Sequence, residues 1–408
     1  MNAQTIHTPA APATATHPWR ILPFRLWLTG GTISLLGDQF YLVALPWLVL
    51  QQTGSAAVMG GIMMTEAVPR ALLMLLGGAL SDRISARKIM MATAAARALC
   101  VAALGVLAWL QIVHTWQLYV LAFAFGVADA FAAPAQSAYL PSLLKPEQLV
   151  AASSLSQGTA QLAGIAGPAP AGLVINMLGV AWGFFADALS FLAIIAVLWK
   201  LPDPPQTHIA GKGLGREIGE AVRYVGSDVP LRSLMLLASC INFCIAGPVS
   251  VGLAYLAKES FDSPLAYGIL VSAVAAGGLL GAVLASVWQI RRRGALIVLA
   301  SLALGLCLGA IGLLSGLWSI VAVLLLMGVT AGVVNIHIGA WIMQRIDPAM
   351  RGRVASVLML ASVGLMPVSL AVAGLLVAWN LKAMFLLAGG AMLLAGMGAG
   401  LQTTVREI

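Results

Sequence analysis

Long apolar runs separated by short polar segments dominate the pattern of this sequence. A helix needs about 20 apolar residues to cross the hydrocarbon core of a bilayer. Twelve runs of suitable length can be marked, near residues 24–50, 56–80, 88–110, 115–137, 149–177, 180–199, 232–257, 265–290, 294–315, 318–344, 354–379 and 381–403. The pattern therefore predicts an all-α membrane protein with twelve transmembrane helices.

Two segments lie outside these runs. Residues 1–19 are rich in Ala, Thr and Pro and lack a basic start followed by an apolar core, so we expect a disordered tail and no cleaved signal peptide. Residues 201–231 begin with a proline cluster and continue as an amphipathic stretch with Ile218, Val222 and Val225 on one face. We interpret this linker as a short helix lying against the bundle surface, with a regulatory site as the alternative.

The sequence also repeats itself at a spacing of about half its length. Two markers occur twice. Gly77-x-x-Leu80 before Arg87-Lys88 matches Gly281-x-x-Leu284 before Arg291-Arg292. The pair Pro146 and Ser154 matches the pair Pro348 and Ser356. The offsets are 204 and 202 residues, which favours duplicated six-helix halves. We predict one bundle over residues 20–200 and a second over 232–408.

Composition and charge agree with a membrane protein. Of 408 residues, 61% are hydrophobic and 9% are charged, whereas soluble domains carry about 25% charged residues. The net charge of +8 comes from residues at the ends of the apolar runs, without the interleaved aromatic side chains of a nucleic-acid site. We therefore expect membrane lipid and a small molecule as partners, and no nucleic acid.

The basic residues predict an orientation. With a cytoplasmic N-terminus, all but four of the 22 Lys and Arg residues fall on the inner side, and the exceptions are Arg70, Arg97, Lys258 and Lys382. Miscounting one helix would invert every later loop and destroy this asymmetry. We expect both termini in the cytoplasm and the chain in the inner (cytoplasmic) membrane, as a monomer.

Signatures of enzymes and metal sites are missing from the sequence. It contains no phosphate-binding loop, no nucleophile elbow and no cluster with metal-ligand spacing. The four cysteines lie in apolar runs and are interpreted as packing residues: Cys100, Cys240, Cys244 and Cys307. We predict a protein that is not an enzyme and has no cofactor and no metal.

The loop between the second and third runs carries the most specific motif. The segment Gly78-Ala79-Leu80-Ser81-Asp82-Arg83-Ile84-Ser85-Ala86-Arg87-Lys88 resembles the major facilitator superfamily signature, although Ser85 and Ala86 displace its usual glycine. The resemblance implies the major facilitator fold, with two pseudo-symmetric six-helix bundles around a cavity. It also implies that Gly78, Asp82, Arg83, Arg87 and Lys88 form a conformational-switch loop.

Other segments resemble the exporter branch that contains macrolide efflux proteins and the enterobactin exporter. They are residues 33–38, 138–144, 187–191 and 351–354. Gly164, Gly167-Pro168 and Gly172 resemble the glycine-proline motif of drug antiporters with altered spacing, and the arginine often found in the fourth helix of such antiporters is missing. The resemblance supports antiport and implies that the first, fourth and tenth helices line the cavity.

Ionisable groups inside the apolar runs are candidates for the transport machinery, because each costs about 2.5–3.5 kcal/mol at the bilayer centre. The first half holds six: Asp38, Glu66, Arg70, Arg97, Asp129 and Asp187. Glu66 and Arg70 are spaced to pair on one helix, and Arg97 could pair with Glu66 or Asp129. Such pairs could also serve only to fix helix packing.

Four acids against two bases leave at least one carboxylate without a cation, and burial favours its protonated form. We hypothesise that Asp38, helped by Asp129 or Glu66, couples proton entry to substrate exit. Asp187 is interpreted as a capping or pairing residue. Polar candidates for substrate contact are Tyr41, Gln136, Gln157, Gln161, Asn242, Asn335 and His337, although such side chains also serve as helix–helix hydrogen bonds.

The leading hypothesis is a secondary transporter, a proton-coupled exporter of amphipathic small molecules such as drugs. An exporter of an endogenous siderophore or secreted metabolite is the close alternative, and a nutrient importer is a second. The cavity-facing helices offer few hydrogen-bonding residues for a polar nutrient. A regulatory protein that transports nothing is the remaining class.

Overall fold

The computed structural model describes residues 17–81, 84–203, 214–288, 292–347 and 350–402. All regular structure in these residues is helical, and twelve helical segments are long and apolar enough to cross a membrane. The prediction of an all-α protein with twelve membrane-spanning segments is confirmed. The segments begin and end within a few residues of the predicted runs.

The N-terminal half contains seven α-helices and three short 3₁₀ turns. The α-helices are α1 (Leu22–Thr53), α2 (Ala56–Ser81), α3 (Ala86–Leu110), α4 (Thr115–Tyr139), α5 (Leu149–Ala166), α6 (Pro168–Leu178) and α7 (Val180–Lys200). The turns are η1 (Pro18–Arg20), η2 (Leu140–Leu143) and η3 (Pro146–Gln148). In the linker, helix α8 (Leu214–Ser227) is followed directly by the next half.

In the described residues, the C-terminal half contains eight α-helices and one π-helical turn. They are α9 (Val229–Gly247), the turn η4 (Pro248–Gly252), α10 (Leu253–Phe261), α11 (Pro264–Val287), α12 (Arg293–Leu313), α13 (Leu317–Arg345), α14 (Arg351–Gly364), α15 (Met366–Trp379) and α16 (Leu381–Leu401). Val225 of α8 is buried with Leu231 and Val354, so α8 packs on this half.

Three predicted helices contain a break in the structure. The run 149–177 is divided at Gly167 into α5 and α6, the run 232–257 contains η4, and the run 354–379 is divided at Leu365. Each break is followed by a proline at the first or second position of the next element. Proline has no backbone N–H and clashes with the preceding turn, so the helix is interrupted there.

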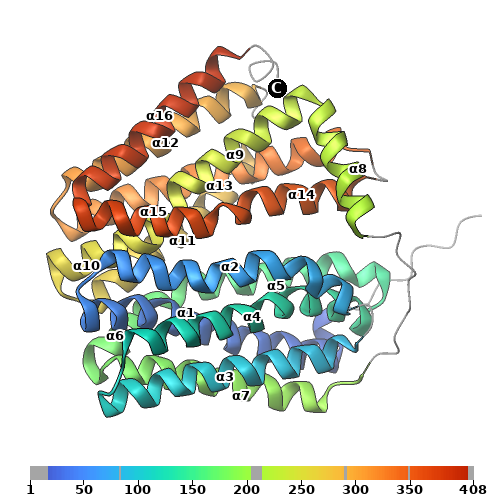
Figure 1. Cartoon of the computed structure of the whole chain (residues 1–408). Coiled ribbons are helices and arrows are strands. Elements are labelled where there is room, and N and C mark those ends of the chain that lie inside the picture. The colour runs from blue at the N-terminus through green and yellow to red at the C-terminus, as the bar shows by residue number, and fades with distance from the viewer. Residues whose placement is uncertain (1–16, 82–83, 204–213, 289–291, 348–349, 403–408) are drawn as a thin grey trace, which may run out of the picture.

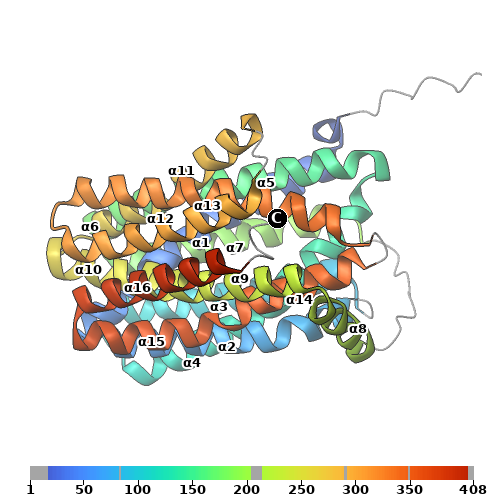
Figure 2. The same cartoon turned by 90° about the horizontal axis from the view of Figure 1, so that it is seen from above.

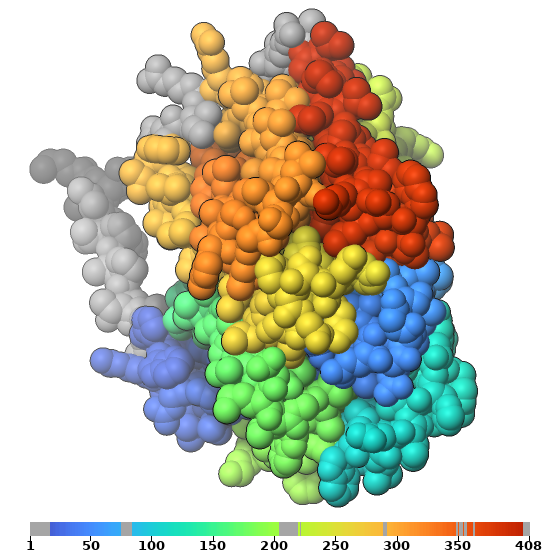
Figure 3. All heavy atoms as spheres, turned by 90° about the vertical axis from the view of Figure 1, so that its left-hand side faces the viewer, coloured from blue at the N-terminus to red at the C-terminus, as the bar shows by residue number. Residues whose placement is uncertain are grey.

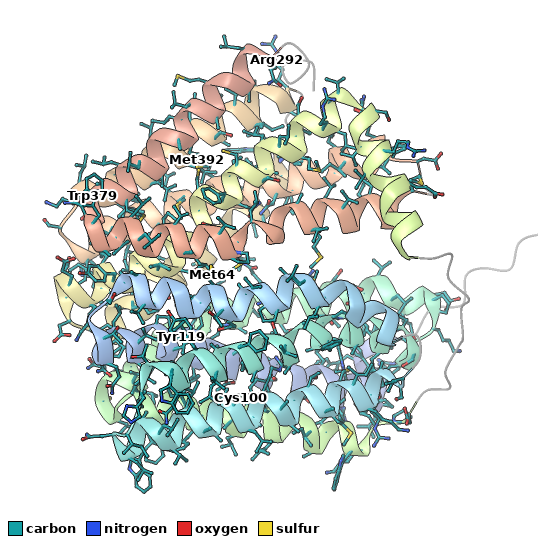
Figure 4. The ribbon with its side chains drawn as sticks, viewed as in Figure 1. Met64, Cys100, Tyr119, Arg292, Trp379 and Met392 are labelled. Carbon is teal, nitrogen blue, oxygen red and sulfur yellow. The ribbon has the colours of Figure 1, made fainter. Side chains whose placement is uncertain are left out.

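The two halves lie side by side with their helices running in roughly one direction (Figures 1 and 2). We call the end where α1 begins and α16 ends the terminal end, and the opposite end the distal end. Figure 4 shows Arg292 and Trp379 at these two ends of the C-terminal half. Within the C-terminal half, glycines bring α11 against α13: a Cβ atom added to Gly277 would lie 3.0 Å from Cα of Gly328. Small residues of this kind allow helices to pack closely in lipid.

Glycines also bring the two halves together near the distal end. A Cβ atom added to Gly60 of α2 would lie 2.9 Å from Cα of Gly374 of α15, and one added to Gly172 of α6 would lie 2.8 Å from Cα of Leu265. Figure 3 shows this end face filled with side chains, with α10 (yellow) wedged against the N-terminal half. The structure therefore shows the halves in contact at the distal end.

Candidate transport cavity

A cavity of about 320 Å³ lies between the halves, and we call it the inter-half cavity. From the N-terminal half it is lined by Asp38, Gln39, Tyr41, Leu42, Leu45, Pro46, Met63, Glu66, Arg70, Arg97, Phe125 and Asp129. From the C-terminal half it is lined by Val249, Ser250, Tyr267, Val271 and Met366. All five residues of the predicted proton-coupling set therefore line one cavity: Asp38, Glu66, Arg70, Arg97 and Asp129.

The α2–α4 contact brings Asp129 to the two arginines. Gly126 lies on the same face of α4 as Asp129, and a Cβ atom added to it would lie 2.9 Å from the carbonyl carbon of Glu66. This close approach lets Asp129 Oδ2 pair with Arg70 Nε at 3.1 Å, while its Oδ1 pairs with Arg97 Nη1 of α3 at 3.2 Å. Each carboxylate oxygen thus binds a different guanidinium group.

The structure does not form the Glu66–Arg70 pair that the sequence allows, but it does form the Arg97–Asp129 pair. Glu66 and Arg70 are spaced to pair along α2, but Arg70 binds Asp129 instead. Arg97 binds Asp129, one of the two partners considered for it, and its guanidinium carbon also lies 4.5 Å from the ring centre of Phe191. Spacing along one helix shows which side chains can pair, but an acid on a neighbouring helix can bind the same arginine.

Within the described part of the chain, Glu66 is bound by a tyrosine and by no cation. The hydroxyl of Tyr41 on α1 donates a hydrogen bond to Oε2 of Glu66 at 3.0 Å. The Tyr41 ring stacks on Phe125 with a centroid distance of 4.3 Å and an interplanar angle of 13°. This contact holds the tyrosine at the cavity wall, where its hydroxyl reaches the carboxyl group.

Asp38 has no protein partner among the described residues. Its Oδ1 atom is buried without a hydrogen-bond partner, and no described ion pair includes it. The Nε atom of Arg97 is also buried and unpartnered. A buried polar atom without a partner is uncommon in folded proteins and marks a place where water, an ion or a ligand group can bind.

Asp187 of α7 is a further buried acid behind α1. It is 0% exposed, its Oδ1 atom accepts a hydrogen bond from Ser190 at 3.2 Å, and its Oδ2 atom has no partner. A Cβ atom added to Gly37 would lie 2.7 Å from Oδ1 of Asp187, so the acid faces α1 directly beside Asp38. Within the described residues, Asp38, Glu66 and Asp187 therefore all lack a cationic partner, because both arginines bind Asp129.

Several predicted polar contacts lie outside the inter-half cavity. Gln136 and Gln157 line a separate cavity of about 290 Å³ between α1, α4 and α5. Gln161 donates a hydrogen bond to the carbonyl oxygen of Ala275 at 3.1 Å and so joins α5 to α11 across the halves. Only Tyr41 of the predicted substrate contacts lines the inter-half cavity.

The three candidates in the C-terminal half are placed elsewhere as well. Asn242 is exposed and donates to the carbonyl oxygen of Ala238, and Asn335 is exposed on α13. His337 is buried between α13 and the end of α11, with its ring nitrogens 2.9 Å and 3.1 Å from the carbonyl oxygens of Val333 and Trp288. These contacts give His337 a packing role.

The cavity wall of the C-terminal half was not predicted from the sequence. It consists of Val249 and Ser250 of η4, Tyr267 and Val271 of α11, and Met366 at the start of α15. Tyr267 is only 2% exposed, and its hydroxyl lies 3.5 Å from the carbonyl oxygen of Ser250. A tyrosine inside an apolar run is a sequence signal by which Tyr267 could have been identified as a candidate.

The predicted switch loop is described in part. Asp82 and Arg83 lie outside the described residues, and Gly78 belongs to the last turn of α2. Arg87 donates hydrogen bonds to the carbonyl oxygens of Leu198 (2.7 Å) and Trp199 (2.9 Å) at the end of α7, and Lys88 is exposed. A cation at a helix C-terminus is stabilising, so Arg87 ties α3 to α7 within one half.

The described residues contain no group of three or more His, Cys, Asp or Glu side chains that could hold a metal ion.

Sequence comparisons connect this geometry to known proteins. The profile of the family described as "Transmembrane secretion effector", of the major facilitator superfamily, matches residues 13–408. The chain is 30% identical over 411 residues to the multidrug efflux pump Tap of Mycolicibacterium fortuitum, covering 95% of this chain and 97% of the pump. It is 25% identical over 347 residues to macrolide efflux protein A of Streptococcus pyogenes, covering 83% and 85% of the two chains.

Solved structures show the same fold at low sequence identity. A point mutant of the nucleoside transporter NupG superposes with a TM-score of 0.79 at 12% identity, covering 93% of this chain and 99% of that one. A bacterial homologue of the iron transporter ferroportin in the inward-facing state superposes with a TM-score of 0.73 at 18% identity, covering 92% and 97%. The predicted major facilitator fold is confirmed.

Proposed function

Because the chain belongs to the transmembrane secretion effector family of the major facilitator superfamily, we propose that this multi-pass membrane transporter is a proton-coupled exporter of amphipathic small molecules, working by alternating access. Family membership makes it a transporter and not an enzyme. The direction of transport, the coupling to protons and the movement of the halves are the parts that we add.

We place the terminal end in the cytoplasm and the chain in the inner membrane. The terminal end carries Arg87, Lys88 and the Arg292-Arg293 pair, whereas Lys258 and Lys382 lie at the distal end. Excess Lys and Arg in cytoplasmic loops sets the orientation of helical membrane proteins. In this orientation the contacts at the distal end close the outer side, and the chain is in the state that loads substrate from the cytoplasm.

The unpartnered carboxyl group of Asp38 in the inter-half cavity carries the proposal of proton coupling. Of the three acids that line this cavity, Asp129 binds two guanidinium groups and Glu66 accepts a hydrogen bond from Tyr41, so we take Asp38 as the acid that exchanges a proton during the cycle. A proton taken up from the outer side would neutralise Asp38. Its release to the cytoplasm would let a loading substrate occupy the cavity beside a charged carboxylate.

The rest of the lining supports an amphipathic substrate. Leu42, Met63 and Met366 contribute apolar side chains that are not fully buried. Gln39, Ser250 and the Tyr41 hydroxyl are among the few neutral polar groups. Surfaces rich in flexible and aromatic side chains accept varied ligands. The multidrug and macrolide efflux relatives agree with drugs as a substrate class. Since one chain supplies the whole lining, we expect a monomer to suffice.

A susceptibility and accumulation screen tests the proposal. Cells that lack their major pumps would express the unsubstituted chain or Asp38→Asn and receive ethidium, erythromycin and a panel of other drugs, with and without a protonophore. We expect lower accumulation of at least one amphipathic compound, lost with the protonophore and lost in Asp38→Asn. Reduced accumulation that survives the protonophore would refute proton coupling, and increased uptake of a nutrient would indicate an importer.

A second screen separates drugs from an endogenous substrate. Culture medium from expressing and non-expressing cells would be compared by mass spectrometry without added drug. A secreted siderophore or metabolite that depends on expression, with no change in drug accumulation, would favour the endogenous alternative over drug export.

A further inference from the structure

A second cavity of about 230 Å³ adjoins the inter-half cavity inside the N-terminal half. The two cavities share Asp38, Arg70, Arg97 and Asp129. They therefore meet at the charged cluster, which is reached from two sides. We call the second cavity the N-half vestibule.

The N-half vestibule extends from the charged cluster to the terminal end. Its lining includes Trp27 near the start of α1, Met90 near the start of α3 and Leu198 near the end of α7. Trp27 and Asp38 are eleven residues apart on α1, which corresponds to about 16 Å along the helix axis. The vestibule thus spans the distance from the helix ends to the middle of the bundle.

All described residues that line the N-half vestibule belong to α1, α2, α3, α4 and α7. The inter-half cavity, in contrast, takes part of its wall from η4, α11 and α15. If the halves rock against each other, the walls of the inter-half cavity separate, while those of the vestibule stay within one bundle. A substrate in the inter-half cavity would likewise leave the vestibule unfilled.

Polar groups line the N-half vestibule between the helix ends and the charged cluster. Ser34 and Gln136 have no side-chain hydrogen bond within the described part of the chain, and the Thr93 hydroxyl donates to the carbonyl oxygen of Met90 at 3.1 Å. At about 30 Å³ per water molecule, the volume has room for several waters, each of which needs two to four polar partners. The volume is below the roughly 300–1,000 Å³ of drug-sized ligand pockets.

The inner end of the vestibule holds the two unpartnered polar atoms of the cluster, Oδ1 of Asp38 and Nε of Arg97. A water chain ending there would give both atoms a partner. The charged or titratable groups around Asp38 on the neighbouring elements are Glu66 and Arg70 on α2, Arg97 on α3, Asp129 on α4, Asp187 on α7 and Tyr41 on α1 itself. Arg70 and Arg97 are already engaged by Asp129, so Asp38 is the acid at the junction that a water molecule can still bind.

We propose that the N-half vestibule is a water-filled proton route that connects Asp38 to the terminal end while substrate occupies the inter-half cavity. The proposal rests on the proposed function, because it assumes that Asp38 exchanges a proton. Its consequence is that loading substrate does not trap the proton: the proton leaves through one half while substrate binds between the halves. Because their routes are separate, the proton can leave Asp38 while substrate binds beside it, and neither blocks the path of the other.

Cysteine reactivity tests the route without any substrate. Thr93→Cys, in a chain whose four native cysteines are replaced by Ala, would be treated in detergent with 2-aminoethyl methanethiosulfonate. Ala133→Phe narrows the vestibule at an exposed lining position of α4, and Ala138→Phe makes the same change at an exposed position of α4 outside the described lining. Val271→Trp fills the inter-half cavity instead.

We expect Ala133→Phe to slow the reaction at position 93 at least tenfold, and Val271→Trp and Ala138→Phe to leave the rate within twofold of the parent. A rate that falls with Val271→Trp but not with Ala133→Phe would show that water reaches Thr93 through the inter-half cavity, which overturns the proposal. Equal slowing by Ala133→Phe and Ala138→Phe would mean that the substitutions distort α4. An unchanged rate in all three variants would mean that the reagent reaches position 93 by neither cavity. Both results would also overturn it.

Proton release provides the functional arm. Purified chain in weak buffer with pyranine would be mixed with ethidium, and the rates of proton release and the ethidium Kd would be compared. We expect Ala133→Phe to slow proton release at least tenfold with an unchanged Kd. No release from the unsubstituted chain would count against the proposed function with ethidium, whereas release at an unchanged rate in Ala133→Phe would refute only the vestibule.

Discussion

Asp38→Asn is the sharpest perturbation of the proposed coupling. The amide has nearly the size of the carboxyl group but does not take up a proton in the same range. Since no described hydrogen bond or ion pair involves the Asp38 side chain, the substitution breaks no contact. It also removes a buried carboxyl group, whose ionised form costs several kcal/mol to desolvate. We therefore expect folding to be retained and coupling to be lost.

The size of the effect follows from the number of carboxyl groups that are free to exchange. Of the three acids that line the inter-half cavity, Asp129 is held by two arginines and Glu66 by Tyr41, which leaves one proton per cycle at Asp38. One proton moving down a gradient of about 1.7 pH units releases about 2.3 kcal/mol. At about 1.4 kcal/mol per factor of ten, this sustains a concentration ratio of about 50. Asp38→Asn should reduce the ratio to 1 while downhill flux of substrate continues.

Proteoliposomes with an imposed pH gradient and no membrane potential measure this ratio directly, with ethidium as the fluorescent probe. Exchange of one singly charged ethidium cation for one proton is electroneutral, so the pH gradient alone drives it. Asp262→Asn is the matched control, because it makes the same chemical change at an exposed acid that pairs with Lys258 at the distal end. We expect the control to keep uphill accumulation. Uphill accumulation by Asp38→Asn at the level of the unsubstituted chain would refute the reasoning and move the search to another acid.

Three further predictions concern the contacts around the cavity. Arg97→Gln should lower the free energy of unfolding in detergent by about 3–5 kcal/mol, and Arg70→Gln by less than about 1 kcal/mol, because the two arginine side chains are 13% and 50% exposed. Equal losses would contradict this. Gly172→Val should part the halves at the distal end, seen as a longer distance between spin labels on α2 and α15, whereas Gly158→Val, with open space around it, should not. Tyr41→Phe removes the hydrogen-bond donor to Glu66 and should lower the free energy of unfolding by about 1–3 kcal/mol. The loss should be smaller in a chain that already carries Glu66→Gln.

The helices are predictable from the sequence because lipid imposes one strong condition on every span. A run of about 20 apolar residues satisfies it whether or not a proline lies inside. Hydropathy therefore predicts the spans but does not register Pro168 or Pro248, where the helices break. Those breaks depend on backbone hydrogen bonding, and in η4 the break places Ser250 at the cavity wall.

The residues of the charged cluster can be predicted because an ionisable group inside a membrane span is costly in free energy. Their pairing partners cannot be predicted in this way. Spacing on α2 favours a Glu66–Arg70 pair, while the structure gives Arg70 to Asp129. What decides this is the close approach of α4 at Gly126, a tertiary contact that no spacing within α2 reports. The cavity wall of the C-terminal half was missed for a related reason, since it consists mostly of ordinary apolar side chains that only the fold brings to Asp38.

The two halves carry different parts of the proposed cycle. Among the described residues, every acid and arginine of the inter-half cavity comes from the N-terminal half, and the C-terminal half adds only neutral side chains. Movement of the C-terminal half can therefore open or cover the cavity without separating the ion pairs of Asp129, which lie within one bundle. Breaking a buried pair costs about 3–5 kcal/mol, more than the roughly 2.3 kcal/mol that one proton supplies at 100 mV. A one-proton cycle is therefore compatible with this arrangement because the charged cluster moves as a unit and only the proton on Asp38 changes place.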